Sequence, residues 1–291
     1  MVQKLPTQPM WESSLRDWAS HVAGEIRIFA LVDLANLHEQ RLAALQVLMN
    51  CGAQNILRDA RPDAQEAGVW LAELPTLPHR GFSITLDQSI AWAKQSACVT
   101  WLKSDLPPDA LSERLHQRTF AELPDHYAVL LRFFDPRVLP ELKTALNAEQ
   151  ARSWWTLGHS WAYVSRARQF ETISLFQSVQ DSFNAPLHLS QQQFDQMLAA
   201  SEVDQVMPEL VREVPNQFLS LDPVQRVPFT RAWLNQANEL NLTSFADRVL
   251  LTVLALKLGI DFLTQPQWQA LLDPIKEGKI TLLQAVKQAT R

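Results

Sequence analysis

Arginine and aspartate side chains lie close together in the otherwise apolar run 129–139. Arg132 and Arg137 flank Asp135, and a guanidinium can donate two parallel hydrogen bonds to a carboxylate. The same groups could bind an anionic ligand, but no nucleophile or base stands beside them, so they form no recognisable active site. We therefore favour an ion pair that holds a corner of the fold over a catalytic or ligand-binding site.

A second candidate site is Ser160, in the run 158–162 (Gly-His-Ser-Trp-Ala). The run is similar to the nucleophile elbow of α/β-hydrolases, with Ala162 in place of the final glycine. An elbow needs a strand before the serine and a helix after it, whereas residues 162–165 have the pattern of a strand, and His188 is the only later histidine. A turn between two strands is the favoured interpretation. The alternative, a serine hydrolase of the α/β-hydrolase type using Ser160, predicts ester hydrolysis that Ser160→Ala abolishes.

Cofactor and metal sites have little support in the sequence. The seven glycines are too widely spaced to form a glycine-rich dinucleotide-binding or phosphate-binding loop. His38 and Glu39 are not followed by a second histidine at the spacing of a zinc protease, and Cys51 and Cys98 form no CxxC pair. We expect no cofactor and no metal.

Composition and charge limit the partners and the compartment. A net charge of -5 argues against nucleic acid or an anionic membrane as the main partner. Residues 1–6 contain no apolar signal core, and the longest apolar stretch, 249–258, is too short to span a bilayer. Free cysteines suit a reducing compartment, so we expect a cytoplasmic protein without stable membrane insertion.

Tryptophan is the most conspicuous aromatic residue, with ten copies against two tyrosines. Trp154, Trp155 and Trp161 cluster just after the expected sheet. Core packing is the favoured interpretation of each, but tryptophan is also enriched at binding hot spots. These three residues are therefore our candidates for partner binding.

The first part of the chain alternates strands with helices. Strands are predicted at 26–33, 69–74 and 98–102, and helices near 87–94 and 109–118. Asn36 and Glu39 resemble a capping box for a helix that buries Leu42, Leu45 and Met49. We predict an α/β lobe with a central sheet flanked by helices.

The run 127–134 (Tyr-Ala-Val-Leu-Leu-Arg-Phe-Phe) is predicted to be a central strand, because both alternating faces are apolar until Arg132. Asp135 then precedes Pro136, a residue that suits the first position of a helix. We expect a tight junction between strand and helix, with Arg132 or Arg137 paired to Asp135.

From about Leu187 the strand signal disappears and helical patterns follow. Ser190 is placed to start one helix, and Ser244 with Asp247 to cap another. The run 249–258 is apolar on all sides, which predicts the buried centre of a helical bundle. We divide the chain into an α/β domain at 1–185 and an all-α helical lobe at 186–291, joined near residues 184–186.

The run 129–139 (Val-Leu-Leu-Arg-Phe-Phe-Asp-Pro-Arg-Val-Leu) closely resembles the LLRFYDPRVL-like signature of a conserved domain found in the effector adaptors, or chaperones, of the type VI secretion system. Phe134 stands where that family commonly has tyrosine. Residues 29–33 are similar to an early strand of the family, residues 68–74 to a second segment with departures at its start, and residues 111–118 loosely to a third. The resemblance covers about residues 25–165 and leaves the helical lobe without a matching motif.

The resemblance implies a binding protein. Members of this family hold the N-terminal region of a cognate toxic effector and load it onto the VgrG spike protein in the cytoplasm of a Gram-negative bacterium. We expect a non-catalytic adaptor or chaperone, in which Arg132, Asp135, Pro136 and Arg137 have a structural role. A third interpretation, an interaction protein outside secretion, would be favoured by the absence of VgrG or effector genes nearby.

Overall fold

The computed structural model describes residues 10–59, 67–75 and 84–289. Contacts between residues divide the chain into two compact units, Met1–Met197 and Leu198–Arg291, so the division lies within helix α8 (Gln191–Glu213). The predicted lack of an apolar signal core concerns residues 1–6, which lie outside the described residues. Among the described helices, none combines the length and the apolar character needed to cross a membrane.

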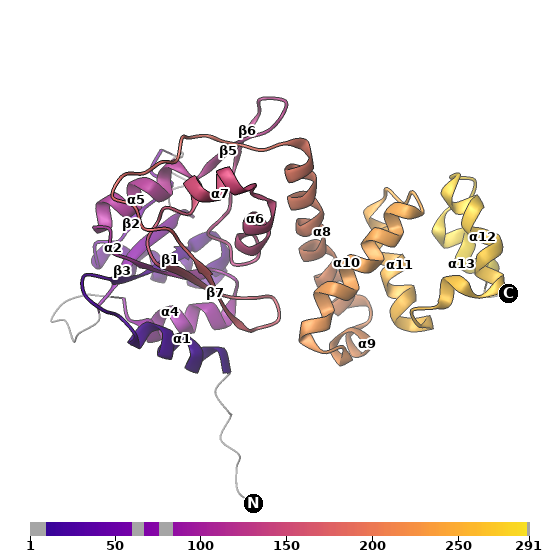
Figure 1. The fold of residues 1–291 in the computed structure, drawn as a ribbon. Helices are drawn as coiled ribbons and strands as arrows, with labels where there is room; N and C mark the ends of the chain where they lie inside the picture. Colours follow the sequence, from indigo (N-terminus) through magenta and orange to yellow (C-terminus); the bar gives the residue numbers. More distant parts are fainter. Residues whose placement is uncertain (1–9, 60–66, 76–83, 290–291) are drawn as a thin grey trace, which may run out of the picture. The chain divides into compact units, whose positions relative to one another are not determined.

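Six strands form the main sheet of the first unit (Figure 1), in the order β2-β3-β1-β4-β7-β8. All neighbouring strands are antiparallel. The strands are β1 (Arg27–Asp33), β2 (Gln54–Asn55), β3 (Val69–Leu74), β4 (Val99–Ser104), β7 (Ser160–Val164) and β8 (Phe170–Ser174). β1, β3 and β4 confirm the strands predicted at 26–33, 69–74 and 98–102, because strands buried in a sheet leave a continuous apolar run.

Helices cover both faces of this sheet, which confirms the predicted α/β architecture. Alternation along β1 directs Phe29 and Leu31 into one core and Ile28, Ala30 and Val32 into the other. α1, α2 and α4 pack on the second core, and α5, α6 and α7 on the first. The helices are α1 (Met10–Ser20), α2 (Arg41–Asn50), α4 (Leu86–Gln95), α5 (Pro108–Gln117), α6 (Leu139–Ala145) and α7 (Ala148–Trp154).

A second, small sheet has the order β6-β5-β9, with β5 (Phe120–Glu122) at its centre. β6 (Ala128–Leu130) pairs antiparallel to β5, and β9 (Leu187–His188) pairs parallel to it. The predicted central strand at 127–134 is therefore wrong, since β6 has three residues and lies at the edge of this small sheet. Apolar character on both faces also suits a buried turn, and the residues after Leu130 form one.

The capping box at Asn36 and Glu39 is also wrong. The carboxylate of Asp33 instead accepts the N–H of Ala35 and starts a 3-10 helix, η1 (Leu34–Gln40), so α2 begins only at Arg41. The extra turn rotates the helix relative to the prediction. Ala44 and Leu48 are buried, and the predicted Leu45 packs partly buried against the same core, whereas the predicted core residues Leu42 and Met49 are 66% and 57% exposed.

The second unit is all-helical, as predicted. It holds the end of α8 followed by α9 (Pro215–Ser220), α10 (Pro223–Glu239), α11 (Phe245–Leu258), η2 (Phe262–Thr264), α12 (Pro266–Lys276) and α13 (Leu282–Ala289). Ser244 Oγ accepts the N–H of Asp247 at the start of α11, and Gly259 ends that helix with φ +97°. Buried residues lie on all sides of α11 from Val249 to Ala255, which confirms this part of the predicted run 249–258 as the centre of the bundle, whereas Leu258 at its end is 47% exposed.

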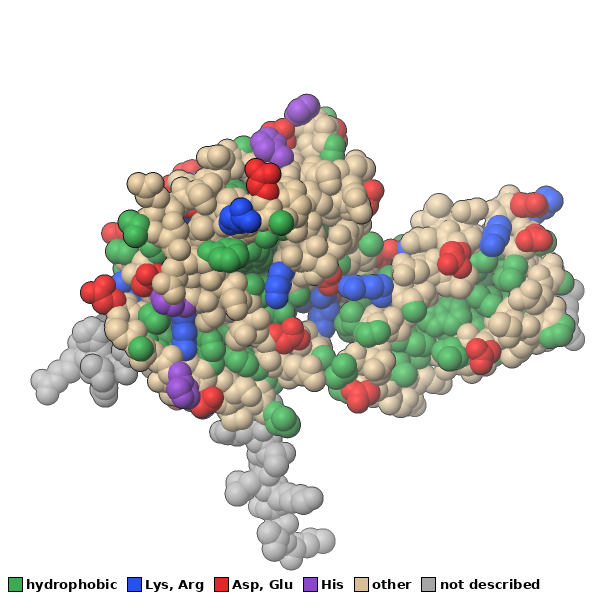
Figure 2. All heavy atoms as spheres, viewed as in Figure 1, with side chains coloured by type: hydrophobic (Ala, Val, Ile, Leu, Met, Phe, Trp, Pro, Cys, Tyr) green, Lys and Arg blue, Asp and Glu red, His purple; other side chains and the backbone are tan. Residues whose placement is uncertain are grey.

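The visible face of the helical unit carries a broad hydrophobic area among scattered acidic and basic side chains (Figure 2). Several large apolar side chains of this unit are exposed, namely Leu198, Val211, Leu219, Val224, Phe245, Leu258, Ile260 and Leu283.

Candidate functional site

The run that resembles the adaptor signature folds as a buried corner between β6 and α6. Phe133 and Phe134 are both buried, which a strand with one face in water would not allow. The side-chain carboxylate of Asp135 accepts a hydrogen bond from the backbone N–H of Arg137 at 2.9 Å. The backbone carbonyl of Asp135 accepts hydrogen bonds from the N–H groups of Val138 and Leu139 at 2.9 and 3.0 Å. An aspartate that binds the backbone two residues ahead closes a turn over the intervening residue, here Pro136.

The predicted start of the helix at Pro136 is wrong for the same reason. α6 begins at Leu139, with Val138 in the capping position, and Pro136 lies within the turn. Proline suits a turn as well as a first helical position, since both require the same φ. The sequence alone therefore did not separate the two.

The turn brings two arginines and two aspartates into one cluster. Arg137 Nη2 lies 2.7 Å from Asp135 Oδ2, and Arg137 Nε lies 3.0 Å from Asp135 Oδ1. Arg132 Nη2 donates to Asp33 Oδ2 at 2.8 Å and lies 3.8 Å from Asp135 Oδ2. The side chains of Arg132 and Arg137 are 42% and 35% exposed, whereas those of Asp33 and Asp135 are 2% and 3% exposed. The cluster is thus two buried anions covered by two partly exposed cations.

Asp33 is the member that the sequence analysis missed. It ends β1, 99 residues before Arg132, and its carboxylate also accepts hydrogen bonds from Ala35 N and Asn36 Nδ2, both at 3.0 Å. Burial raises the pKa of Asp33, and the neighbouring Arg132 offsets part of that rise. A carboxylate at the end of a buried strand needs hydrogen-bond or ion-pair partners. The aspartate that closes the apolar run 28–32 was therefore the signal in the sequence that could have identified Asp33 as a member of the cluster.

Cys98 lies behind the cluster and is fully buried. Burial, with a smaller contribution from the charges of Asp33 and Asp135, raises the pKa of its thiol to about 12. A thiol with this pKa is protonated at neutral pH and is a poor nucleophile.

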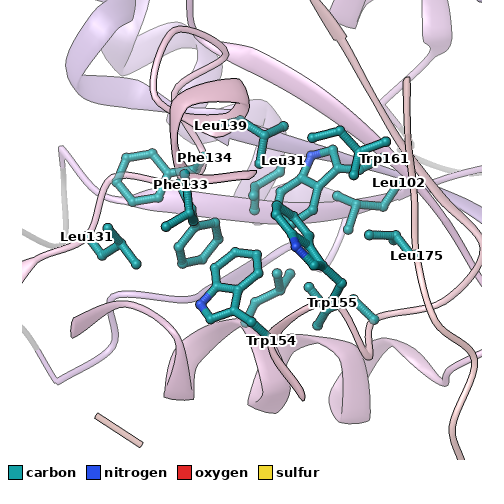
Figure 3. Packing of buried hydrophobic residues seen from close by; sticks show 14 of the residues in the cluster. Leu31, Leu102, Leu131, Phe133, Phe134, Leu139, Trp154, Trp155, Trp161 and Leu175 are labelled. Carbon is teal, nitrogen blue, oxygen red and sulfur yellow. The ribbon is translucent and has the colours of Figure 1, made fainter. Parts of the chain in front are cut away.

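The three candidate tryptophans lie in the core on the other side of the corner (Figure 3). The centroid of the Phe133 ring lies 5.3 Å from that of Trp154 and 5.8 Å from that of Trp161. The ring centroids of Trp154 and Trp155 lie 4.5 Å apart. Trp154, Trp155 and Trp161 are 0%, 3% and 0% exposed. Their side chains are therefore packed within this fold and are almost wholly covered by the rest of the chain. Burial of large aromatic rings contributes strongly to the stability of a core.

Ser160 lies at the start of β7, with helix α7 before it and a strand after it. This order is the reverse of a nucleophile elbow, and it also replaces the predicted turn between two strands. Ser160 Oγ accepts a hydrogen bond from Trp18 Nε1 at 3.2 Å, and the neighbouring His159 Nδ1 lies 2.8 Å from Gln177 Nε2. Gly158 has φ +136°, and a Cβ there would lie 2.7 Å from the backbone of Lys103 and Ser104, so close packing accounts for this glycine.

The cluster can present guanidinium donors but has no neighbouring nucleophile that is activated. Within the described residues, Arg132 donates to Asp33 and the rest of its guanidinium contacts no protein acceptor. Such a side chain can bind a carboxylate or a carbonyl group from outside. The described residues include no group of three or more His, Cys, Asp or Glu side chains arranged to hold a metal ion.

We predict that Asp135→Ala lowers the free energy of unfolding by about 2–3 kcal/mol, because it removes the turn acceptor and leaves Arg137 without its bidentate partner. Asp135→Asn keeps the acceptor for the Arg137 N–H and should cost less. Urea unfolding measures both. Asp17→Ala, at a carboxylate that is 77% exposed, is the control and should change little. Equal stability of the Asp135→Ala variant and the parent protein would contradict the structural role of this turn.

Residues 28–153 match the model of a family described as "Domain of unknown function (DUF4123)". The matched stretch contains Asp33, the buried corner at 131–139 and both arginines of the cluster. No curated protein matches the chain, and no solved structure matches it either.

Proposed function

We propose that this chain is an adaptor that binds a toxic effector and loads it onto the VgrG spike of a type VI secretion system. The observation that carries the proposal is the match of residues 28–153 to the DUF4123 model, a family associated with type VI effector adaptors. The signature-like run 129–139 lies inside the matched stretch and forms a buried corner of the fold.

In this proposal the protein needs no cofactor, catalyses no reaction, and works in the cytoplasm of a Gram-negative bacterium. Several features support a binding role. The acidic charge of -5 favours protein partners over nucleic acid, and the charged cluster exposes guanidinium donors without an activated nucleophile. Exposed apolar side chains in both units provide area for contact with a partner protein.

Co-expression with the effector encoded at the same locus tests the proposal. We expect the two proteins to co-elute in size-exclusion chromatography, to remain together at micromolar concentration, and to separate when the N-terminal region of the effector is deleted. Addition of the VgrG protein should then give a ternary complex. Separate elution of chain and effector would contradict the proposal.

The same complex separates this function from a hydrolase. Ser160→Ala should leave the effector complex intact, because Ser160 Oγ lies under Trp18. A panel of simple esters provides the second measurement. Turnover by the parent protein that Ser160→Ala abolishes would establish a catalytic activity and overturn the non-catalytic part of the proposal.

A further inference from the structure

The hairpin formed by β5 and β6 has a free strand edge. β6 pairs with β5, and within the described residues it pairs with no other strand. Leu123 N donates to Tyr127 O, and Leu131 N donates to Thr119 O. Because hydrogen-bonded pairs alternate along an antiparallel ladder, Ala128 and Leu130 direct their N–H and C=O groups away from β5. This edge therefore offers a row of backbone donors and acceptors.

The solvent face of the hairpin exposes two large apolar side chains. Phe120 and Leu130 lie opposite each other on this face and are 46% and 43% exposed, and the next pair on the face is Glu122 with Ala128. The opposite face carries Ala121, which is buried against the core. Outward positions of a sheet with one solvated face are usually polar, so exposed apolar side chains here indicate a surface for contact. The hairpin projects from the rest of the first unit (Figure 1).

Arg132 follows β6 and adds charge at the end of this edge. Asp33, which is 2% exposed, holds one nitrogen of the guanidinium, and Arg132 itself is 42% exposed. The guanidinium also lies 5.9 Å from the Phe134 ring. A guanidinium fixed on one side retains donors in a planar arrangement that matches a carboxylate. At the other end of β6, Asp125 lies in the turn and Glu122 ends β5, so both side chains there are acidic.

We propose that an extended segment of the effector adds to the edge of β6 as a further strand, and that Arg132 binds a carboxylate of this segment. The proposal rests on the proposed adaptor function and identifies where the effector is held. The outward N–H and C=O groups of Ala128 and Leu130 can pair only with a partner segment in an extended conformation. A helical segment could not pair with them, because its backbone N–H and C=O groups are already bonded to each other within the helix. Phe120 and Leu130 favour apolar residues at alternate positions of the segment, and Arg132 favours an acidic residue near one end.

Two variants of the edge test the proposal. Ala128→Pro removes an N–H that points away from β5, and proline is tolerated on edge strands. Leu130→Lys places a charge on the apolar face, a change that discourages strand addition. We expect each variant to weaken effector binding about tenfold or more in a fluorescence titration. Leu42→Lys, at a leucine on α2 that is 66% exposed, is the matched control and should bind the effector as the parent protein does.

A double-mutant cycle tests the carboxylate. Arg132→Gln keeps a donor for Asp33 but removes the positive charge. Short overlapping peptides of the effector first identify the segment that binds, and its acidic residues are then replaced by their amides. We expect each single change to weaken binding about fivefold and the combined change to weaken it hardly further. Fully additive losses would contradict a direct contact with Arg132.

The outcomes separate this inference from the proposed function. Failure of the parent protein to bind the effector would count against the adaptor function itself. Binding by the parent protein that neither Ala128→Pro nor Leu130→Lys weakens, with thermal unfolding of both unchanged, would overturn the strand addition and leave the adaptor function standing. A dimer of the effector-free chain that Ala128→Pro disrupts, with effector binding unchanged, would assign the edge to a second copy and also overturn the inference.

Discussion

Replacing Asp181 by alanine is expected to lower the free energy of unfolding by about 3–5 kcal/mol, because it leaves a buried arginine without its counter-charge. Arg118 is 0% exposed, and its Nη1 and Nη2 each donate to one carboxylate oxygen of Asp181 at 2.7 Å. Its remaining donors reach the carbonyls of Trp154, Ser153 and Arg114. Removal of the carboxylate therefore leaves the positive charge of the fully buried Arg118 without its counter-charge.

The pair also ties together segments that are distant in sequence. Arg118 follows α5, its carbonyl acceptors lie in α5 and at the end of α7, and Asp181 belongs to the segment between β8 and β9. Asp181 further accepts hydrogen bonds from Thr156 Oγ1 and Phe183 N. Loss of Asp181 should therefore loosen this segment as well as lower global stability, which hydrogen exchange can measure.

Chemical denaturation measures the main effect, with Asp181→Asn as the matched variant. The asparagine retains hydrogen-bonding groups but no charge, so it should cost less than the alanine. Asp195→Ala, at an exposed carboxylate in α8, should change stability by no more than about 0.5 kcal/mol. A loss of similar size for the Asp181 and Asp195 variants would show that the buried pair contributes little.

The pH dependence provides an independent check. Burial raises the pKa of Asp181, but the hydrogen bonds and the charge of Arg118 outweigh burial and hold the pKa below its usual value of 3.8. A carboxyl whose pKa is lower in the folded state stabilises the protein above the unfolded pKa and loses that contribution as the pH falls through the folded pKa. The parent protein should therefore lose more stability below about pH 4 than Asp181→Asn does, in unfolding curves measured at several pH values. Parallel curves would contradict the assignment.

Phe133→Ala is expected to cost about 3–5 kcal/mol of unfolding free energy, since it leaves a cavity among packed rings. Phe133 is 0% exposed and lies 5.5 Å from Phe134, 5.3 Å from Trp154 and 5.8 Å from Trp161 (Figure 3). Rings packed in this way stabilise the fold both by burying apolar surface area and by edge-to-face contacts. A change in the intensity or wavelength of tryptophan fluorescence in the Phe133→Ala variant should report the loss of packing around Trp154 and Trp161.

Tyr127→Ala is the control in the same segment, because Tyr127 is 70% exposed. We expect a change within about 0.5 kcal/mol. A continuous strand at 127–134 would place both side chains on one buried face, and the two variants would then lose similar amounts of stability. The difference between them therefore measures directly whether the chain turns after Leu130.

Several elements could be predicted from the sequence because their burial leaves a local pattern. β1, β3 and β4 are buried in the sheet and appear as apolar runs, and α11 is apolar on all sides because it is enclosed by its bundle. The helices α4 and α5 follow from their period and from their polar flanks. In each case, the neighbours in sequence share one environment, so a short window contains the necessary information.

The candidate site depends on packing between distant segments, which no short window contains. An apolar run shows that residues 131–134 are buried but does not distinguish a strand from a turn, and Asp135 settles that question by binding the backbone of Arg137. The pairing of Arg132 with Asp33 joins residues 99 apart. The sequence by itself determined that the run 129–139 is largely apolar, charged at its centre and similar to an adaptor signature. Only the tertiary structure decided that the tryptophans face inward and that β6 pairs, among the described strands, with β5 alone, because burial and strand pairing are set by which distant surfaces pack together.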